Sequence, residues 1–327
     1  MVMNNPGWAG WFRKLPKALR VLCVAVAVTV LAAWLAGRLV SDHFGWSQWL
    51  QWIPTPAALL AAAGGFTAAF RAGPTPVRRT YRLLAWGASS LAIGAYFVVI
   101  EHRFIRTSPS EPPGLRIVHW NMRAHQGTAL EKLAEKLIDF DGDLTVVTTA
   151  GRAPWQEAIR EWLGPNARPH AIGPFVVLTR QPILERRPIL ADGGVYIALL
   201  RIDGGEAIGR PLTVYLVDLP SDPKQPRGRI ARRARRLLDE VGAPPPDVVL
   251  GDFNMTRGSA AMRHLFPDLH HAFDEAGRGY GATFPRPAPL YHIDHTLLAD
   301  GLRATAYELV DPGVGSHLVQ IGHVVAR

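Results

Sequence analysis

The chain has 327 residues and a formal net charge of +9, and that charge belongs entirely to its first third. Residues 1–106 hold 11 Lys and Arg against two acidic residues, whereas residues 107–327 hold 25 residues of each sign. Because the larger part is neutral, its composition does not indicate a nucleic-acid-binding domain, although it does not exclude one. The one cysteine, Cys23, lies in the first third, so residues 107–327 cannot form a disulfide within themselves.

Three uncharged runs rich in apolar residues occupy the first third, at residues 21–37, 44–70 and 83–100. A bilayer core requires about 20 predominantly apolar residues. A secretory signal peptide followed by two buried helices is the alternative, but such a peptide has a shorter apolar core and a cleavage site before polar sequence. We therefore expect residues 1–106 to be a membrane anchor with three transmembrane helices, at about 21–37, 53–70 and 83–100.

Positive charge on the flanks of these runs predicts their orientation. The loop between the first two runs holds only Arg38, which Asp42 offsets. Excess Lys and Arg mark the cytoplasmic side of a membrane protein. The sequence therefore predicts a multi-pass protein of the inner or cell membrane, with its globular part outside the cytoplasm. The basic residues are Arg13, Lys14, Lys17 and Arg20 before the first run, and Arg71, Arg78, Arg79 and Arg82 before the third.

A Pro- and Ser-rich segment, residues 107–114, is typical of a linker and separates the anchor from a domain at 115–327. That domain alternates apolar strands with amphipathic helices, which predicts a single α/β domain with a strand-rich core. The expected helices are 128–140 and 227–242. The expected strands are 115–121, 143–149, 174–179, 195–202, 212–219, 247–250, 292–298, 303–309 and 317–326.

Polar residues follow the short apolar strand DVVL directly, in the sequence GDFN. Asp252 and Asn254 are two residues apart, so in an extended chain they face the same side. Polar groups at strand ends of layered α/β folds commonly line ligand sites. A turn or a helix cap is the alternative interpretation of this pair.

The order of several short motifs resembles the endonuclease/exonuclease/phosphatase superfamily. The motifs are HWNMR, PFVVLTRQPI, VYLVDLPSDP, GDFN, YHIDHTLLADGL and GSHLVQIGHV, and together they span the whole domain. The resemblance implies a DNase-like four-layer α/β/β/α sandwich with its site at the strand ends. It also implies hydrolysis of a phosphate ester assisted by Mg²⁺ or Mn²⁺.

The resemblance assigns a role to each matching residue. It places Asn121 near the metal and makes Asp252 the group that orients or deprotonates the attacking water. Asn254 is implied to hold a phosphate oxygen, and Asp294 to orient His317, whose charged form would stabilise a pentacovalent phosphate. A purely structural Asp294–His317 pair remains the alternative.

Three positions depart from the family pattern. Thr149 stands where the family has its principal metal-binding glutamate, Ser316 where it has an aspartate, and Asp218 where it has a histidine. Because Mg²⁺ is held chiefly through carboxylates and water, we expect binding of Mg²⁺ or Mn²⁺ to be weak or absent. Asp218 is either a relocated metal ligand or, as we favour, a turn residue.

Two functions stay open at this stage. One is an extracytoplasmic phosphoesterase acting on nucleic acid, nucleotides or phospholipid headgroups; the other is an inactive relative that binds a phosphorylated ligand or a protein partner. We interpret the arginines of residues 227–236 as the solvated face of a helix, in preference to a surface that binds phosphate. His119, His125, His292, His295 and His323 show no spacing typical of metal ligands, and nothing indicates the oligomeric state.

Overall fold

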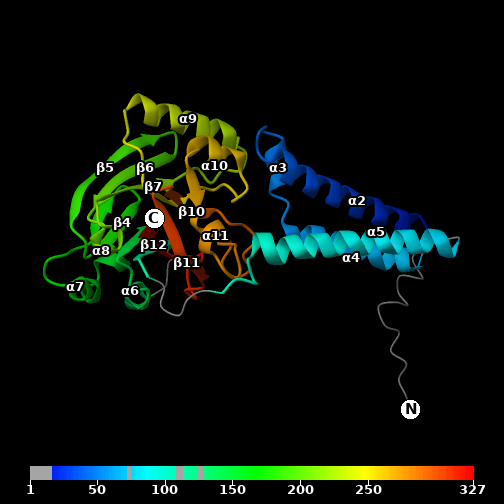
Figure 1. The fold of residues 1–327 in the computed structure, drawn as a ribbon, viewed down its shortest axis with the longest axis horizontal. Helices are drawn as coiled ribbons and strands as arrows, with labels where there is room; N and C mark the ends of the chain where they lie inside the picture. Colours follow the sequence, from blue (N-terminus) through cyan, green and yellow to red (C-terminus); the bar gives the residue numbers. More distant parts are fainter. Residues whose placement is uncertain (1–16, 72–74, 108–112, 124–128) are drawn as a thin grey trace, which may run out of the picture. The chain divides into compact units, whose positions relative to one another are not determined.

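The computed structural model describes residues 17–71, 75–107, 113–123 and 129–327. The chain divides into two compact units, one of residues 1–41 and 46–101 and the other of residues 42–45 and 102–327. We call them the helical unit and the sandwich unit (Figure 1). Most of the expected linker, the start of the expected helix 128–140, and His125 lie outside the described residues.

The helical unit contains α2 (Lys17–Val40), α3 (Ser47–Gln51), α4 (Thr55–Arg71), α5 (Pro76–Ala95) and a π-helix, η1 (Tyr96–Glu101). All three apolar runs are helical, but only Ala18–Val40 and Pro76–Glu101 are long and apolar enough to cross a membrane by length and composition. The 17-residue α4 reaches only about 26 Å, short of a hydrocarbon core of about 30 Å. The expectation of three spanning helices is therefore supported for two of them.

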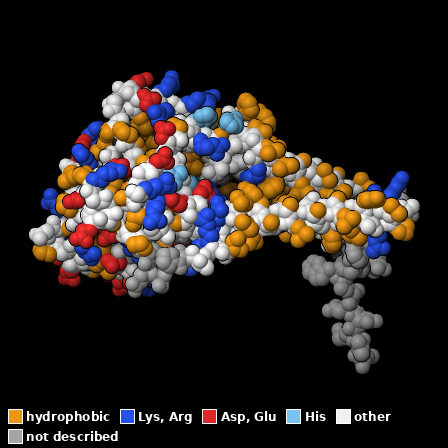
Figure 2. Space-filling model, in the orientation of Figure 1, with side chains coloured by type: hydrophobic (Ala, Val, Ile, Leu, Met, Phe, Trp, Pro, Cys, Tyr) orange, Lys and Arg blue, Asp and Glu red, His pale blue; other side chains and the backbone are white. Residues whose placement is uncertain are grey.

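Large apolar side chains cover the outside of the helical unit, as the predominance of orange in its part of Figure 2 shows. Leu39 and Leu91 are 76% and 77% exposed. The inside is small: Ala58 and Ala62 of α4 are fully buried beside Trp34 of α2. Alanines at these two positions let the helix backbones approach closely.

The sandwich unit is built from two six-stranded sheets. In the first, the strand order is β11 (Leu302–Val310), β12 (Val319–Ala326), β1 (Leu115–Asn121), β2 (Leu144–Thr148), β4 (Phe175–Thr179), β3 (His170–Ile172). In the second, it is β5 (Ile183–Asp192), β6 (Val195–Ile202), β7 (Leu212–Asp218), β8 (Val248–Asp252), β10 (Asp294–Ala299), β9 (Leu269–His271).

Helices cover the outer face of each sheet, which makes four layers (Figure 1). On the first sheet these are α6 (Leu130–Asp139) and α7 (Glu157–Leu163); on the second they are α9 (Arg227–Glu240) and α10 (Ala260–Leu265). Three short helices, η2 (Ala153–Trp155), α8 (Gly205–Ile208) and α11 (Ala272–Ala276), lie in the connections. The α/β/β/α arrangement expected from the sequence is thus present.

Strand periodicity decides which side chains lie between the sheets. In β8, Val248 and Leu250 belong to the core between the two sheets, whereas Val249 packs against the helices on the outer face. Successive side chains of a strand point to opposite faces. Asp252 therefore continues the inner row, and the inter-sheet core ends in a carboxylate at this strand.

β5 was not expected from the sequence, and the composition of this strand explains why. Pro188 cannot donate a hydrogen bond to a sheet, and four of its neighbours, Glu185, Arg186, Arg187 and Ile189, give no clear alternation. The strand lies at the edge of its sheet, with an irregularity between Pro188 and Leu190. An edge is the position at which a proline is tolerated.

Candidate active site

Three carboxylates lie side by side across the second sheet. Asp218 ends β7, Asp252 ends β8 and Asp294 begins β10. The strand register pairs Asp218 with Asp252, and Asp252 with Asp294. Each of the three continues the inner row of its strand, so they form an acidic row at one end of the inter-sheet core.

Asp252 is held on both of its oxygens. The Asn121 side-chain amide, from β1 of the other sheet, donates to Oδ2 at 2.9 Å. The backbone N–H of Asn254 donates to Oδ1 at 2.9 Å. Asn254 adopts φ +50°, a conformation that asparagine tolerates better than most residues. Its side-chain amide donates to the Leu219 carbonyl at 2.9 Å, which uses one of the two hydrogens of that amide.

Asp294 and His317 form a buried pair. The imidazole Nδ1 lies 2.8 Å from Asp294 Oδ2, and the two side chains are 1% and 3% exposed. Burial works against the charge on His317, but the carboxylate of Asp294 outweighs it and raises the histidine pKa. Burial likewise works against the charge on Asp294, and His317 outweighs it, so the pKa of Asp294 is lowered. Because Nδ1 faces the carboxylate, the ring presents Nε2 away from it.

The other two carboxylates of the row hold protons more tightly. Burial, and then the charge on Asp294, raises the pKa of Asp252 to about 8. The same two causes raise the pKa of Asp218 to about 6. Adjacent carboxylates do not all ionise readily, so the row favours one charge on Asp294 and a proton on Asp252.

Asp252, Asp294 and His317 offer ligand atoms within 4.8 Å of one another. Asp294 Oδ1 is buried and has no hydrogen-bond partner among the described residues. An acidic row with such an oxygen fits a hard divalent cation, which prefers carboxylate ligands.

The other positions at which the family binds its metal do not offer suitable ligands in this chain. The Thr149 hydroxyl donates to Asn121 Oδ1 at 2.9 Å, the oxygen that would face a metal. The Thr149 backbone has φ +50°, which is strained for a β-branched residue. Ser316 Oγ is buried and also lacks a hydrogen-bond partner among the residues described. Thr149 and Ser316 thus replace two carboxylates of the family pattern, and the Asn121 oxygen already accepts a hydrogen bond.

A chain of polar groups lies beneath the site in the first sheet. Tyr307 OH donates to Gln320 Oε1, Gln320 Nε2 bonds His119 Nδ1 at 2.6 Å, and His119 Nε2 bonds the Thr148 hydroxyl at 3.0 Å. Burial lowers the pKa of His119 to about 4, so the ring is neutral. This role of His119 was not expected from the sequence, although its position two residues before Asn121 places both side chains on one face of β1.

The structure thus brings Asn121, Asp252, Asn254, Asp294 and His317 to one end of the inter-sheet core. Asp218 ends β7 beside Asp252 and belongs to the same row. The catalytic and metal-binding roles of these residues remain predictions.

The fold matches known structures. A mannosyl-6-phosphatase from Bacteroides thetaiotaomicron is 13% identical, with TM-score 0.52, over 64% of this chain and 99% of that one. An endonuclease/exonuclease/phosphatase family protein from the same organism is 14% identical, with TM-score 0.53, over 66% and 99%. A functionally unknown conserved protein from Enterococcus faecalis is 13% identical, with TM-score 0.50, over 65% and 100%. At these identities the likeness concerns the fold alone.

Comparison with curated protein sequences gave no match. A family model described as the Endonuclease/Exonuclease/phosphatase family matches residues 118–317, which is more than half of the chain. The match begins within β1 and ends at His317, so it includes every residue of the candidate site. The chain therefore belongs to the Endonuclease/Exonuclease/phosphatase family.

Proposed function

We propose that the chain is a phosphate-ester hydrolase, acting on a phosphodiester or a phosphomonoester through Asp252, Asn254, Asp294 and His317. The observation that carries this proposal is the buried Asp294–His317 pair, joined to Asp252 within one 4.8 Å cluster. A charged imidazole beside a carboxylate of raised pKa combines an electrostatic stabiliser with a candidate base.

In this mechanism Asp252, once ionised, orients the attacking water and accepts its proton. Asn121 and the Asn254 backbone fix the position of that carboxylate. His317, kept charged by Asp294, stabilises negative charge on the phosphoryl oxygens, and the Asn254 amide binds one of them. A divalent cation, when bound, would be held by Asp252 and Asp294 and would neutralise further charge on the phosphate.

A second function, ligand binding without turnover, is favoured by one observation. The bond between the Thr149 hydroxyl and Asn121 Oδ1 occupies the oxygen that a metal would need. A site of this kind still offers His317 and Asn254 to a phosphate group. The second proposal is therefore an inactive family member that binds a phosphorylated ligand.

The substrate class is proposed from charge and from the comparisons. Residues 107–327 carry no net charge, and a long polyanion is bound chiefly through excess Lys and Arg. Small phosphate esters therefore fit better than long nucleic acid. Because a mannosyl-6-phosphatase has a similar fold, sugar phosphates should be tested as substrates together with nucleotides and phospholipid headgroups.

Phosphate-ester turnover by the full-length protein in detergent tests the first function. With nitrophenyl phosphate mono- and diesters and added Mg²⁺ or Mn²⁺, we expect turnover that falls about a hundredfold in Asp294→Asn, because His317 then loses the carboxylate that keeps it charged. Asp300→Asn is a matched control, because Asp300 follows the last residue of β10 whereas Asp294 begins that strand. Asp300 lies 3.8 Å from the ring of His270.

Equal turnover in wild type and Asp294→Asn contradicts the proposed mechanism. No turnover in any protein, together with binding of inorganic phosphate that Asp294→Asn weakens, supports the second function instead.

We also propose that residues 1–106 anchor the chain in the inner or cell membrane, with 107–114 as linker and residues 115–327 as the family domain outside the cytoplasm. The two long apolar helices and the exposed leucines of the helical unit support anchoring. The basic residues that flank α2 and α5 support the orientation.

A reporter enzyme fused after Arg327 tests this topology. We expect activity from a reporter that works only outside the cytoplasm, because three spans, with the shorter α4 as the third, would place the two ends of the anchor on opposite sides of the membrane. The same fusion to a reporter that works only in the cytoplasm is expected to be inactive. A signal from the cytoplasmic reporter, or full-length protein that is soluble without detergent, rules the topology out.

A further inference from the structure

Three buried histidines gather where β9 pairs with β10 at the edge of the second sheet, and His295 points to the face opposite the acidic row. His271 ends β9, His292 precedes β10, and His295 lies in β10 next to Asp294. One ring nitrogen from each lies within 4.8 Å of the others. We propose that this histidine cluster binds a zinc-class divalent transition metal ion, a site separate from the phosphoesterase site and not indicated by the sequence spacing.

Hydrogen bonds fix the direction of two of the rings. The Phe273 backbone N–H donates to His271 Nδ1 at 3.2 Å, so the proton of this ring lies on Nε2. His271 Nε2 lies 2.6 Å from His295 Nδ1, and His295 Nε2 donates to the Met255 carbonyl at 2.7 Å. A metal-bound histidine commonly donates a hydrogen bond from its other ring N–H to a carbonyl in this way.

The two facing nitrogens share one proton at the place where a metal would bind. The ion takes the place of that proton on His271 Nε2, and the ring changes tautomer by taking up a proton on Nδ1, so that it stays neutral. The 3.2 Å hydrogen bond from the Phe273 N–H to His271 Nδ1 is lost when the ion binds. Tetrahedral coordination places two nitrogen ligands about 3.3 Å apart, so the two rings part slightly when the ion binds.

His292 supplies the observation that points to a ligand. Neither of its ring nitrogens has a hydrogen-bond partner among the described residues, and the side chain is buried. The ring lies parallel to that of His295, at 5.0 Å between centroids and 4° between planes. A buried polar group without a partner is costly, and coordination to an ion with His271 and His295 removes that cost.

The charges around the histidine cluster are compatible with a metal site whose ligands are neutral imidazoles. Burial and the neighbouring His295 lower the pKa of His292, although the Gly281 backbone opposes this, so the ring is neutral and available as a ligand. Arg257 lies next to the cluster, with its guanidinium 4.7 Å from the centre of the Phe273 ring. Asp274, 3.6 Å from Arg257, offsets that positive charge. Imidazole ligands without carboxylates select borderline transition metals over Mg²⁺.

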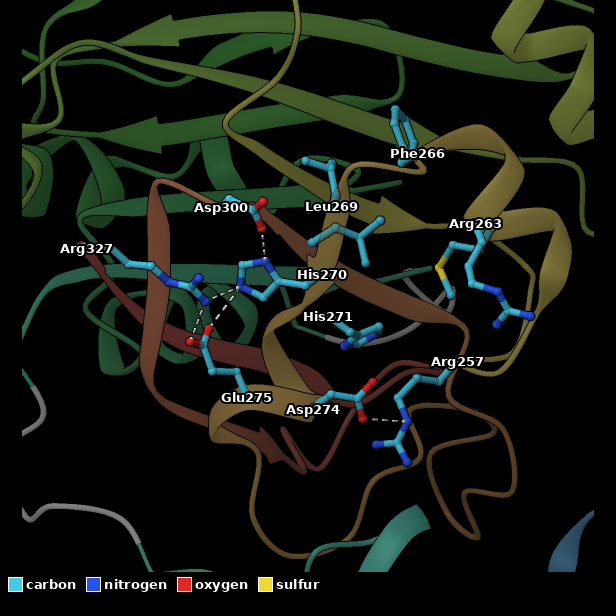
Figure 3. A pocket seen from close by; sticks show the side chains of 12 residues that line it. Arg257, Arg263, Phe266, Leu269, His270, His271, Asp274, Glu275, Asp300 and Arg327 are labelled. Carbon is cyan, nitrogen blue, oxygen red and sulfur yellow. Dashed lines mark hydrogen bonds and ion pairs between the residues drawn. The ribbon is translucent and has the colours of Figure 1, made fainter.

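A route for the ion leads through a surface cavity of about 550 Å³ (Figure 3). His271 lies on its lining beside Arg257 and Asp274, and His270 lines the same cavity. An ion bound by the cluster would tie the end of β9 to the start of β10. It would thereby fix the segment that carries Asp294, without contacting the substrate.

Cobalt titration of the full-length protein tests the proposal, because Co²⁺ reports its coordination through visible absorption. In excess Mg²⁺ we expect one equivalent of Co²⁺ to bind with a spectrum typical of nitrogen ligands, and Zn²⁺ to displace it. A wild-type protein that develops no such spectrum overturns the proposal.

Two matched variants locate the ion. His292→Phe keeps an aromatic ring of similar size in the same buried position, so this variant should fold. We expect its Co²⁺ affinity to fall on the order of a hundredfold. His270→Phe makes the same change at a histidine that lines the cavity beside His271 but lies outside the cluster, and it should leave the affinity and spectrum unchanged. The proposal is overturned if His292→Phe binds Co²⁺ like wild type, or if only His270→Phe loses binding.

Discussion

Replacing Asp252 with asparagine is expected to lower kcat/KM for any phosphate ester that the protein hydrolyses by about 10³-fold, within the range attributed to a general base. The change preserves the shape of the side chain and its contact with the Asn254 N–H. It removes the group that would take the proton from water. The measurement is kcat/KM for the wild type and the variant at several pH values.

The pH dependence provides a second readout of the same change. Because the pKa of Asp252 is raised to about 8, the ionised base is scarce at neutral pH. The rate of wild type is therefore expected to rise as the pH increases toward that value. A divalent cation held by Asp252 and Asp294 favours the ionised form, so added Mg²⁺ should move the rise to lower pH.

Asp203→Asn is the matched control for this experiment. Asp203 is exposed and accepts the N–H of Gly205, two residues on, at 3.0 Å, which is the same local geometry as that of Asp252 and Asn254. We expect the control to retain full activity. Turnover that survives Asp252→Asn would mean that the chemistry lies elsewhere or in a contaminant.

The double change Thr149→Glu with Ser316→Asp is expected to raise the affinity for Mg²⁺ on the order of a hundredfold, since the number of carboxylates largely sets the affinity of such sites. Removing the Thr149 hydroxyl also releases Asn121 Oδ1 from its 2.9 Å bond. A glutamate is less strained than a threonine at φ +50°. Isothermal titration of the full-length protein with Mg²⁺ measures the effect.

Thr149→Gln with Ser316→Asn is the uncharged control, and it should bind Mg²⁺ no better than wild type. A wild-type protein that already binds Mg²⁺ tightly would contradict the weak site expected here. In that case other ligands have taken over, and Asp218, beside Asp252 in the acidic row, is the first to test.

The order of short motifs predicted the family, and this prediction is confirmed by the match over residues 118–317. It succeeded because each motif is a strand with a polar end, and alternation along a strand is visible in sequence. The inner position of Asp252, for example, follows from Val248 and Leu250, four and two residues before it. Packing of the two sheets then brings the strand ends together.

What the sequence could not reveal depends on contacts between distant segments. Nothing in the spacing of Asn121 and Thr149 predicts that the hydroxyl occupies the asparagine oxygen. The histidine cluster joins His271 to two residues more than twenty positions away, across a connection that holds the short helix α11 and otherwise little regular structure. The short edge strands β3 and β9 were not predicted, because a strand of three residues is too short to show a recognisable alternation of apolar and polar side chains.

The hydrogen bonds that cross between the sheets limit how this domain can move. Asn121 of the first sheet bonds Asp252 of the second, and Thr296 of the second bonds Gln320 of the first at 3.4 Å. A shear motion of one sheet over the other would break both bonds inside a buried interior, where unmade bonds are costly. Adjustment to ligands of different size must therefore come from hinge motions of the surrounding loops, while the two sheets stay in fixed alignment.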